Sequence, residues 1–390
     1  MSAVADPTVP GLLAELDGIG RDERGGWTRP GFGGAVSLLQ RWFTERAQEL
    51  GLDVSRDRNR NLWAWWGVPG PGAVVTGSHL DSVPGGGRLD GPLGVVSALV
   101  AVQRLRASGF RPARPVAVAV LAEEEGSAFG VACLGSRLLT GAVDPAAVLP
   151  AGFDGLDDPG RDDEALARIG CFVELHVEQG RGLVDLDAPV GLATGILAHG
   201  RWRITVTGRG DHAGTTRMAD RTDPVVAAAR VVLAVEQAAL AVEGARATVG
   251  RVEAVPGGTN VIASRVELSL DVRAEDGATV RALVARIEEA GGLEAARNGC
   301  AFGLEQGSWS DEVVFDAALR ERLDAALGGV PALPTGAGHD AGVLAAHVPT
   351  AMLFVRNPTG VSHAPEEDAS DADMAAGAAA LELALRTLAA

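Results

Sequence analysis

One segment constrains the fold of this chain more than any other. Residues 115–122, PVAVAVLA, are all apolar and lead directly into three consecutive glutamates, Glu123, Glu124 and Glu125. A short, continuously apolar run rich in valine is typical of a strand buried on both faces, and such strands occur in parallel sheets covered by helices. We therefore expect an α/β domain, with polar side chains where its strands end.

The same pattern recurs elsewhere in the chain. Three further apolar segments lead into polar stretches that contain a histidine, and segments with the apolar spacing of helices separate them. This alternation predicts a mixed, mostly parallel sheet flanked by helices. The apolar segments are residues 73–78, 171–175 and 350–356, and the histidines after them are His79, His176 and His363.

The pattern changes between residues 201 and 307. Residues 201–208, 247–253 and 265–273 alternate polar and apolar side chains, which indicates half-exposed antiparallel strands. A long apolar-spaced segment at 224–241 predicts a helix among them.

We therefore predict an inserted α+β domain that acts as a lid and in dimerisation. The catalytic domain would be discontinuous, and a helix capped near Ser310 and Asp311 would open its second part. The predicted ranges are residues 1–200 and 308–390 for the catalytic domain and residues 201–307 for the insertion.

Composition excludes several classes of function. A net charge of −17 repels nucleic acids and anionic membranes, and no apolar run approaches the ~18 residues of a spanning helix. All basic residues are arginine and there is no tyrosine, which excludes Schiff-base lysines, P-loop lysines and tyrosine acids. The three cysteines, Cys133, Cys171 and Cys300, are expected to be free thiols. We expect a cytoplasmic protein.

The polar strand ends favour a divalent-metal site. Imidazole and carboxylate ligands suit zinc or manganese, and the absence of neighbouring thiolates favours a catalytic site over a structural one. A pair of ions needs a bridging carboxylate, for which Asp90, in the loop after His79, is the candidate. A water acidified by the ions would be the nucleophile, and a second carboxylate must accept its proton. Adjacent Glu124 and Glu125 offer one ligand and one base.

Eight motifs carry a family resemblance when read in order. From about Asp57 to the C-terminus, the chain resembles the N-carbamoyl-L-amino acid hydrolases and allantoate amidohydrolases. These are di-metal amidohydrolases of the aminoacylase and carboxypeptidase-like clan. The motifs are GSHLDSVPGGGRLDGPLG, EEEGSAFG, ELHVEQG, GDHAGTTRM, GGTNVI, DVR, GAGHDA and RNPTGVSHAPEE.

The resemblance implies roles for matched positions in the catalytic domain. Glu124 matches the general base, and Asp81 matches a carboxylate that orients the imidazole of His79. Gln179 and His339 match substrate-pocket positions, with turn or supporting roles as open alternatives. The matched metal ligands are His79, Asp90, Glu125, His176 and His363, with Asp90 bridging.

The resemblance also implies a homodimer. His212 matches a histidine that reaches across the dimer to stabilise the oxyanion, and Asn260 and Arg273 match residues that bind the substrate carboxylate. The chain departs from the family pattern at Ala128, where arginine is usual, and at Arg217, where proline is usual.

The expected function is metal-dependent hydrolysis of the ureido or carbamoyl C–N bond of allantoate or an N-carbamoyl-L-amino acid. Two divalent ions per subunit are expected, zinc or manganese, with cobalt or nickel also suited to these ligands. An aminoacylase or dipeptidase-like activity, or a non-catalytic metal-binding relative, is the alternative. No nucleic-acid or membrane partner is expected.

Overall fold

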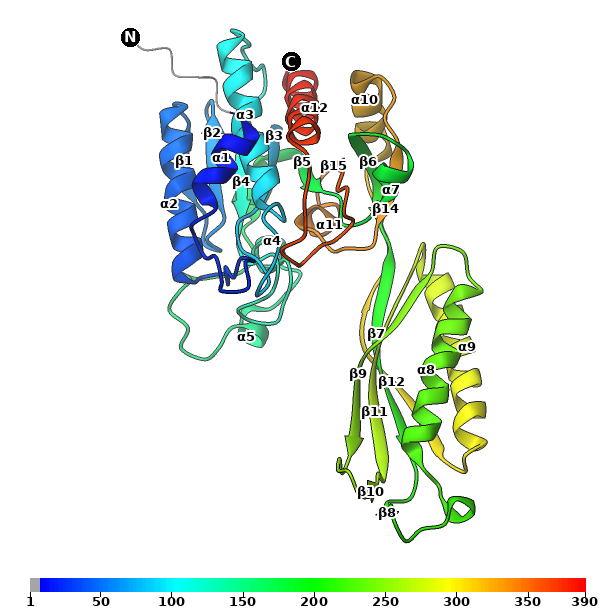
Figure 1. The fold of residues 1–390 in the computed structure, drawn as a ribbon. Coiled ribbons are helices and arrows are strands. Elements are labelled where there is room, and N and C mark those ends of the chain that lie inside the picture. The colour runs from blue at the N-terminus through cyan, green and yellow to red at the C-terminus, as the bar shows by residue number, and fades with distance from the viewer. Residues whose placement is uncertain (1–7) are drawn as a thin grey trace. The chain divides into compact units, whose positions relative to one another are not determined.

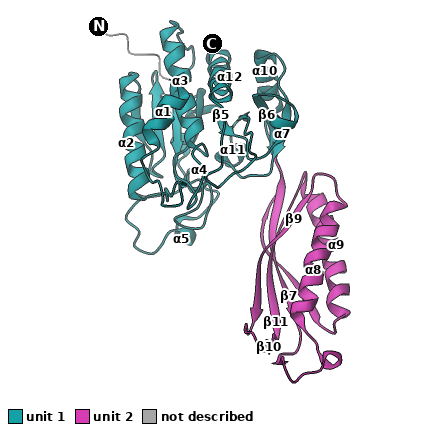
Figure 2. Cartoon of the chain, in the orientation of Figure 1, with its two compact units in different colours: residues 1–195, 314–390 teal, residues 196–313 magenta. Residues whose placement is uncertain are grey.

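The computed structural model describes residues 8–390, which divide into two compact units with separate hydrophobic cores (Figures 1 and 2). Unit 1 comprises Met1–Gly195 and Val314–Ala390, and unit 2 comprises Ile196–Val313. Residues 1–7, which the predicted catalytic domain includes, lie outside the described residues. Within the described part, no helix is long and apolar enough to cross a membrane.

Unit 1 is built on a mixed sheet of nine strands. Its four central strands, β4, β3, β5 and β15, are parallel, whereas β1, β2 and β6 pair antiparallel at the flanks. In sheet order the strands are β1 (Asp53–Arg56), β2 (Leu62–Trp66), β4 (Val116–Leu121), β3 (Ala73–His79), β5 (Ile169–Val177), β15 (Thr350–Val355), β6 (Val190–Ile196) and β13 (Val313–Val314), and β14 (Ala332–Thr335) pairs with β6.

The parallel strands explain why distant parts of the sequence meet. Every residue of β4 and β15 is buried, as expected for strands covered on both faces. Because the four strands run in the same direction, their carboxyl ends lie along one edge of the sheet. That edge carries His79, Glu124, Glu125, His176 and the loop after β15.

Helices cover this sheet. The central helix α3 packs against α12, β3 and β5, and its first residue is Pro92, at a position that favours proline. The final helix α12 is capped by the side chain of Ser370. The helices of unit 1 are α1 (Val9–Leu16), α2 (Gly34–Glu49), α3 (Pro92–Ala107), α4 (Leu134–Thr140), α5 (Pro145–Val148), α6 (Asp163–Arg168), α7 (Gly182–Asp185), α10 (Ala317–Leu327), α11 (Asp340–Leu344) and α12 (Asp371–Ala389).

Unit 2 is an α+β unit with a four-stranded antiparallel sheet and two helices that pack on each other. A separate two-stranded pairing joins β8 to β10. In sheet order the strands are β12 (Ala301–Ser310), β7 (Ala198–Thr207), β11 (Arg265–Ala274) and β9 (Arg246–Val255). The other elements are β8 (Asp211–His212), β10 (Val261–Ile262), α8 (Pro224–Leu240), α9 (Gly277–Ala296) and the 3-10 helix η1 (Met218–Asp220).

The prediction of a helix that begins near Ser310 and Asp311 is wrong. β12 pairs with β7 as far as Ser310, which lies opposite His199, so this stretch is a strand. The next helix, α10, begins at Ala317, where the side chain of Asp316 accepts a hydrogen bond from Leu319 N at 2.7 Å. The local Ser-Asp signal for a helix start is overridden by cross-strand pairing.

Gly94 provides a test of the packing of α3 on the sheet. A Cβ at this position would lie 2.2 Å from the backbone oxygen of Leu175 in β5. We predict that Gly94→Ala lowers the free energy of unfolding by about 1–3 kcal/mol, the usual cost of overpacking. The control is Gly34→Ala in α2, where a Cβ meets nothing within 4 Å. Equal stability of both variants by denaturant unfolding would contradict the close α3–β5 approach.

Candidate metal centre

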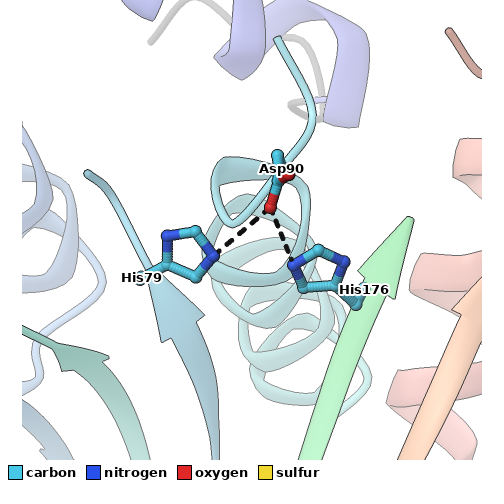
Figure 3. Close-up of side chains that lie close together, drawn as sticks. All are labelled: His79, Asp90 and His176. Carbon is cyan, nitrogen blue, oxygen red and sulfur yellow. Dashed lines mark ion pairs between the residues drawn. The ribbon is translucent and has the colours of Figure 1, made fainter. Parts of the chain in front are cut away.

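The carboxylate of Asp90 lies at the centre of a cluster of histidines. Its Oδ1 is 3.5 Å from Nε2 of His79 and 3.2 Å from Nε2 of His176, and both rings point toward it (Figure 3). Its Oδ2 is 3.4 Å from Nε2 of His363 and accepts a hydrogen bond from Nε2 of Gln179 at 2.9 Å. Each oxygen of Asp90 therefore faces a different set of side chains.

The unpaired atoms of this cluster fit a metal centre. His79, His176 and Asp90 are each no more than 3% exposed. Nε2 of both histidines and Oε1 of Glu125 are buried without a hydrogen-bond partner among the described residues. Buried polar atoms almost always have a hydrogen-bond partner. Ring nitrogens and a carboxylate oxygen that lack one and lie around one carboxylate are therefore suited to binding a metal ion.

Two groups of ligand atoms share Asp90. The first is His79, Asp90 and His176, and the second is Asp90, Glu125 and His363, with the ligand atoms of each group within 4.8 Å of one another. Oε2 of Glu125 lies 3.4 Å from Nε2 of His363. This arrangement has the donor types and the shared carboxylate that a pair of divalent ions requires.

A third group, Glu174, His176 and His339, also brings its ligand atoms within 4.8 Å. Glu174, however, already accepts hydrogen bonds at both oxygens, from Oγ of Ser78 at 2.8 Å and from Ala341 N at 3.0 Å. His339 lies with its ring centroid 4.6 Å from that of His176, and burial lowers its pKa well below the usual value. We interpret Glu174 as a residue that ties β3, β5 and α11 together.

Hydrogen bonds to the backbone fix the tautomer of both buried histidine ligands. Nδ1 of His79 donates to the backbone oxygen of Asp81 at 3.0 Å, and Nδ1 of His176 donates to that of Val177 at 2.9 Å. In its neutral form, each ring therefore carries its proton on Nδ1 and leaves Nε2 as an unprotonated ligand atom directed at Asp90. Gly91 allows this, because a Cβ there would lie 2.5 Å from Nδ1 of His79.

The carboxylate of Asp81 lies beside His79 and also contacts the next strand end. It is 3.6 Å from Nδ1 of His79, farther than the residue's own backbone oxygen. Its closest contacts are with the next strand end, where it accepts hydrogen bonds from Glu124 N at 3.1 Å and Glu125 N at 3.0 Å. Asp81 thus holds the backbone of both glutamates as well as lying behind His79.

Glu124 is buried beside the cluster. Its Oε2 lies 3.8 Å from Nε2 of His79, and its Oε1 accepts a hydrogen bond from Sγ of Cys133 at 3.2 Å. Burial raises the pKa of Glu124 well above its ordinary value, opposed by His79 and reinforced by neighbouring carboxylates, including Glu125. A buried carboxyl group with a raised pKa, next to the ligands but in neither Asp90 group, is suited to accepting and returning a proton.

His212 and Asn260 lie together in unit 2. β8 and β10 pair, and Ala213 N donates to the backbone oxygen of Asn260 at 3.0 Å. The side chain of His212 is exposed, and its Nδ1 accepts a hydrogen bond from Gly214 N at 3.0 Å. The neutral ring therefore carries its proton on Nε2, where it can donate to a ligand.

Arg273 lies in the four-stranded sheet, at the end of β11 that is away from β8. β8 follows the end of β7 that pairs with Arg265, whereas Arg273 pairs with His199 at the beginning of β7. A strand of ten residues such as β11 spans roughly 30 Å. The guanidinium of Arg273 binds the carboxylate of Asp271 through two hydrogen bonds of 2.8 and 3.1 Å.

The two departures from the family pattern lie in turns. Ala128 is exposed, and its backbone N–H donates to the carboxylate of Glu123. Arg217 immediately precedes η1 and binds Asp220, with Nε 2.7 Å from Oδ2. Neither residue contacts Asp90 or the residues grouped with it.

Sequence reasoning missed two buried acids at the centre, Glu174 and Glu367. Glu174 was visible as the one acid inside the otherwise apolar run before His176. Glu367 follows His363 by four residues, but nothing local indicates that it contacts the loop of Asp90, 277 residues earlier.

The mostly parallel sheet and the histidines and carboxylates gathered at its strand ends define a metal-dependent α/β hydrolase. Residues 75–387 match the family described as Peptidase family M20/M25/M40, and the chain belongs to this family. It is 36% identical to the N-carbamoyl-L-amino acid amidohydrolase of Geobacillus stearothermophilus, over 95% of each chain.

Two further comparisons agree. The chain is 32% identical to the allantoate amidohydrolase of Escherichia coli strain K12, over 97% of this chain and 96% of that protein. The crystal structure of an amidase of the hydantoinase/carbamoylase family from Burkholderia multivorans matches with a TM-score of 0.88 and 30% identity, over 98% of this chain and 97% of that one. The predicted family and fold are confirmed, and the protein is an amidohydrolase.

The raised pKa values predict a pH-dependent stability of the metal-free protein. Burial, with the charge of Asp90, raises the pKa of Glu125 and of Glu367 to about 8. Burial alone would lower the pKa values of His79 and His176. Nearby carboxylates outweigh this effect, so both pKa values are raised. Groups with raised folded-state pKa values stabilise the fold at low pH and lose this contribution as pH rises through those values.

We therefore expect the melting temperature of the metal-free protein to fall between pH 6.5 and about 8. The pKa of His339 is lowered below 6.5, so its contribution to the free energy of unfolding no longer changes with pH above 6.5. His339 therefore does not oppose this trend. Divalent ions bind the deprotonated ligands, so added Mn²⁺ should raise the melting temperature more at pH 8 than at pH 6.5. A metal-free melting temperature that rises over this window would contradict the assignment.

Proposed function

We propose that this protein hydrolyses the ureido or carbamoyl C–N bond of a small carboxylate substrate, either allantoate or an N-carbamoyl-L-amino acid. The observation that carries the proposal is the position of Asp90, with one oxygen facing His79 and His176 and the other facing His363. The curated relatives named above add the substrate class by similarity.

The ions would be held by two sets of residues that share Asp90. His79 and His176 would complete the first set, and Glu125 and His363 the second. Divalent ions bound there would polarise the substrate carbonyl and lower the pKa of an attacking water. Gln179 now donates to Oδ2 of Asp90, so an ion at that oxygen would compete with this hydrogen bond.

Glu124 would act as the general base and acid. Its carboxylate would accept the proton of the attacking water and return it to the leaving nitrogen. The hydrogen bond that Glu124 N donates to the carboxylate of Asp81 holds the backbone at this position, and the contact with Cys133 constrains the side chain. Its raised pKa suits a group that must hold a proton transiently.

Unit 2 would supply oxyanion and carboxylate contacts in a homodimer. Arg273 lies at the end of β11 away from the β7 end that leads to β8, and a ten-residue strand spans roughly 30 Å, so we expect that one subunit cannot bring His212, Asn260 and Arg273 to one small substrate. This separation supports Arg273 acting with its own subunit and His212 and Asn260 acting at the site of the partner. His212 would donate from Nε2 to the oxyanion, and Arg273 would bind the carboxylate through its planar guanidinium.

Substituting Glu124 and Glu125 one at a time distinguishes the proposed general base from the proposed metal ligand. We predict that Glu124→Gln retains its bound metal while turnover falls roughly 10²–10⁴-fold, the usual contribution of a general base. Glu125→Gln should instead lose metal, because the amide replaces a ligand oxygen. Elemental analysis and turnover measured on the same preparations test both. Near-normal activity of Glu124→Gln would rule out Glu124 as the base.

A mixing experiment tests the shared site. Glu124→Gln and His212→Ala should each be nearly inactive alone. In a mixed dimer, one site would combine an intact Glu124 with an intact His212 from the other subunit, so activity should recover. No recovery after subunit exchange, with mixed dimers demonstrated by differential tags, would place His212 in its own subunit or outside the site.

The substrate is tested directly by ammonia release from allantoate and a series of N-carbamoyl-L-amino acids, with N-acetyl amino acids and dipeptides assayed for amino acid release. The proposal expects turnover of a ureido or carbamoyl substrate by the Mn²⁺- or Zn²⁺-loaded protein. Turnover of acyl amino acids or dipeptides alone would favour the aminoacylase or dipeptidase alternative. No turnover with full metal content would favour a non-catalytic relative.

A further inference from the structure

The carboxyl group of Glu367 contacts the loop that carries Asp90. Oε1 of Glu367 accepts hydrogen bonds from Leu89 N at 2.9 Å and from Asp90 N at 3.0 Å. The residue is 4% exposed. We call these two hydrogen bonds the Glu367 loop contact. They join the segment between β15 and α12 to the loop between β3 and α3.

The loop is shaped to admit this carboxyl group. A Cβ at Gly87 would lie 2.2 Å from Oε1 of Glu367 and 2.4 Å from its Cδ. Among the three consecutive glycines of this loop, Gly85 has a φ of +74° and serves the turn, whereas Gly87 makes room for Glu367. Any other side chain at position 87 would displace the acid from the loop.

The same short segment carries His363. This histidine is half exposed and adopts a φ of +59°, a left-handed conformation that is uncommon outside glycine. His79 and His176, in contrast, lie in strands, and their rings are fixed by hydrogen bonds to the backbone. The position of His363 relative to Asp90 therefore depends on how its segment is attached to the Asp90 loop.

We propose that Glu367 is a positioning residue that sets the distance between Asp90 and His363 and thereby the affinity of the second metal set, Asp90, Glu125 and His363. This inference rests on the proposed metal centre. It assigns Glu367 no ligand role. Oε1 accepts two backbone N–H groups, and although Oε2 is buried without a hydrogen-bond partner, the residue belongs to none of the three groups of ligand atoms found among the described residues. Loss of the Glu367 loop contact would loosen the second set and leave the His79 and His176 side of Asp90 in place.

Titration of the metal-free protein with Mn²⁺ tests the proposal, with calorimetry and electron paramagnetic resonance as readouts that do not depend on activity. Glu367→Ala removes the acceptor, and Glu367→Gln keeps an acceptor oxygen without the charge. Glu366→Ala, at the exposed neighbouring position, is the matched control. We expect Glu367→Ala to weaken one of two ions by about 10–100-fold, as is usual for residues that orient ligands. Glu367→Gln and Glu366→Ala should bind both ions nearly as the wild type does.

Gly87→Ala is expected to break the Glu367 loop contact while leaving Glu367 itself unchanged. It should weaken the same ion as Glu367→Ala does, because the added methyl group displaces Oε1. The double variant should be no weaker than the weaker single variant, since both substitutions remove one contact. Circular dichroism of each metal-free variant verifies that it is folded before titration.

Each contrary result has a distinct meaning. Two ions bound by Glu367→Ala with wild-type affinity would overturn the positioning role. Equal weakening by Glu367→Gln and Glu367→Ala would overturn it in favour of a charge or ligand role, and equal weakening of both ions would indicate a general structural role. A wild-type protein that binds no Mn²⁺ would contradict the metal centre itself, and the positioning role with it.

Discussion

The buried carboxylate of Asp90 is the constraint on which unit 1 depends. Burial alone would raise its pKa, but the neighbouring rings of His176 and His79 hold that pKa well below the ordinary value. An ionised group in the interior is costly unless it is paired and hydrogen-bonded. Here the partners come from the ends of β3 and β5 and from the segment after β15. The charge of Asp90 is therefore stabilised only when the parallel sheet brings these partners together.

Two buried acidic residues, Asp81 and Glu174, keep this geometry in register. Asp81 accepts hydrogen bonds from Glu124 N and Glu125 N, which links the end of β3 to the end of β4. Glu174 links β3, β5 and the first turn of α11. Carboxylates that accept backbone N–H groups position neighbouring side chains with little freedom, which a site of several ligands requires.

Much of this centre could be predicted from the sequence because its signals are local. Apolar segments ending in histidine or glutamate identified β3, β4 and β5, and ordered motifs identified the family. The structure differed where a long-range contact decides: Ser310 continues a strand because β7 lies beside it. It also revealed a contact that no local signal indicates, between the carboxylate of Asp81 and the backbone of the next strand end. Glu367 could not be found, since its partner, the Asp90 loop, lies 277 residues away.

The central claim is that the two oxygens of Asp90 serve two different ions. Anomalous diffraction from crystals grown with Mn²⁺ and measured at wavelengths on both sides of the metal absorption edge tests it most directly. We predict two peaks, one between Asp90 and the pair His79 and His176, the other between Asp90, Glu125 and His363. A single peak, or a peak enclosed by Glu174, His176 and His339, would contradict it.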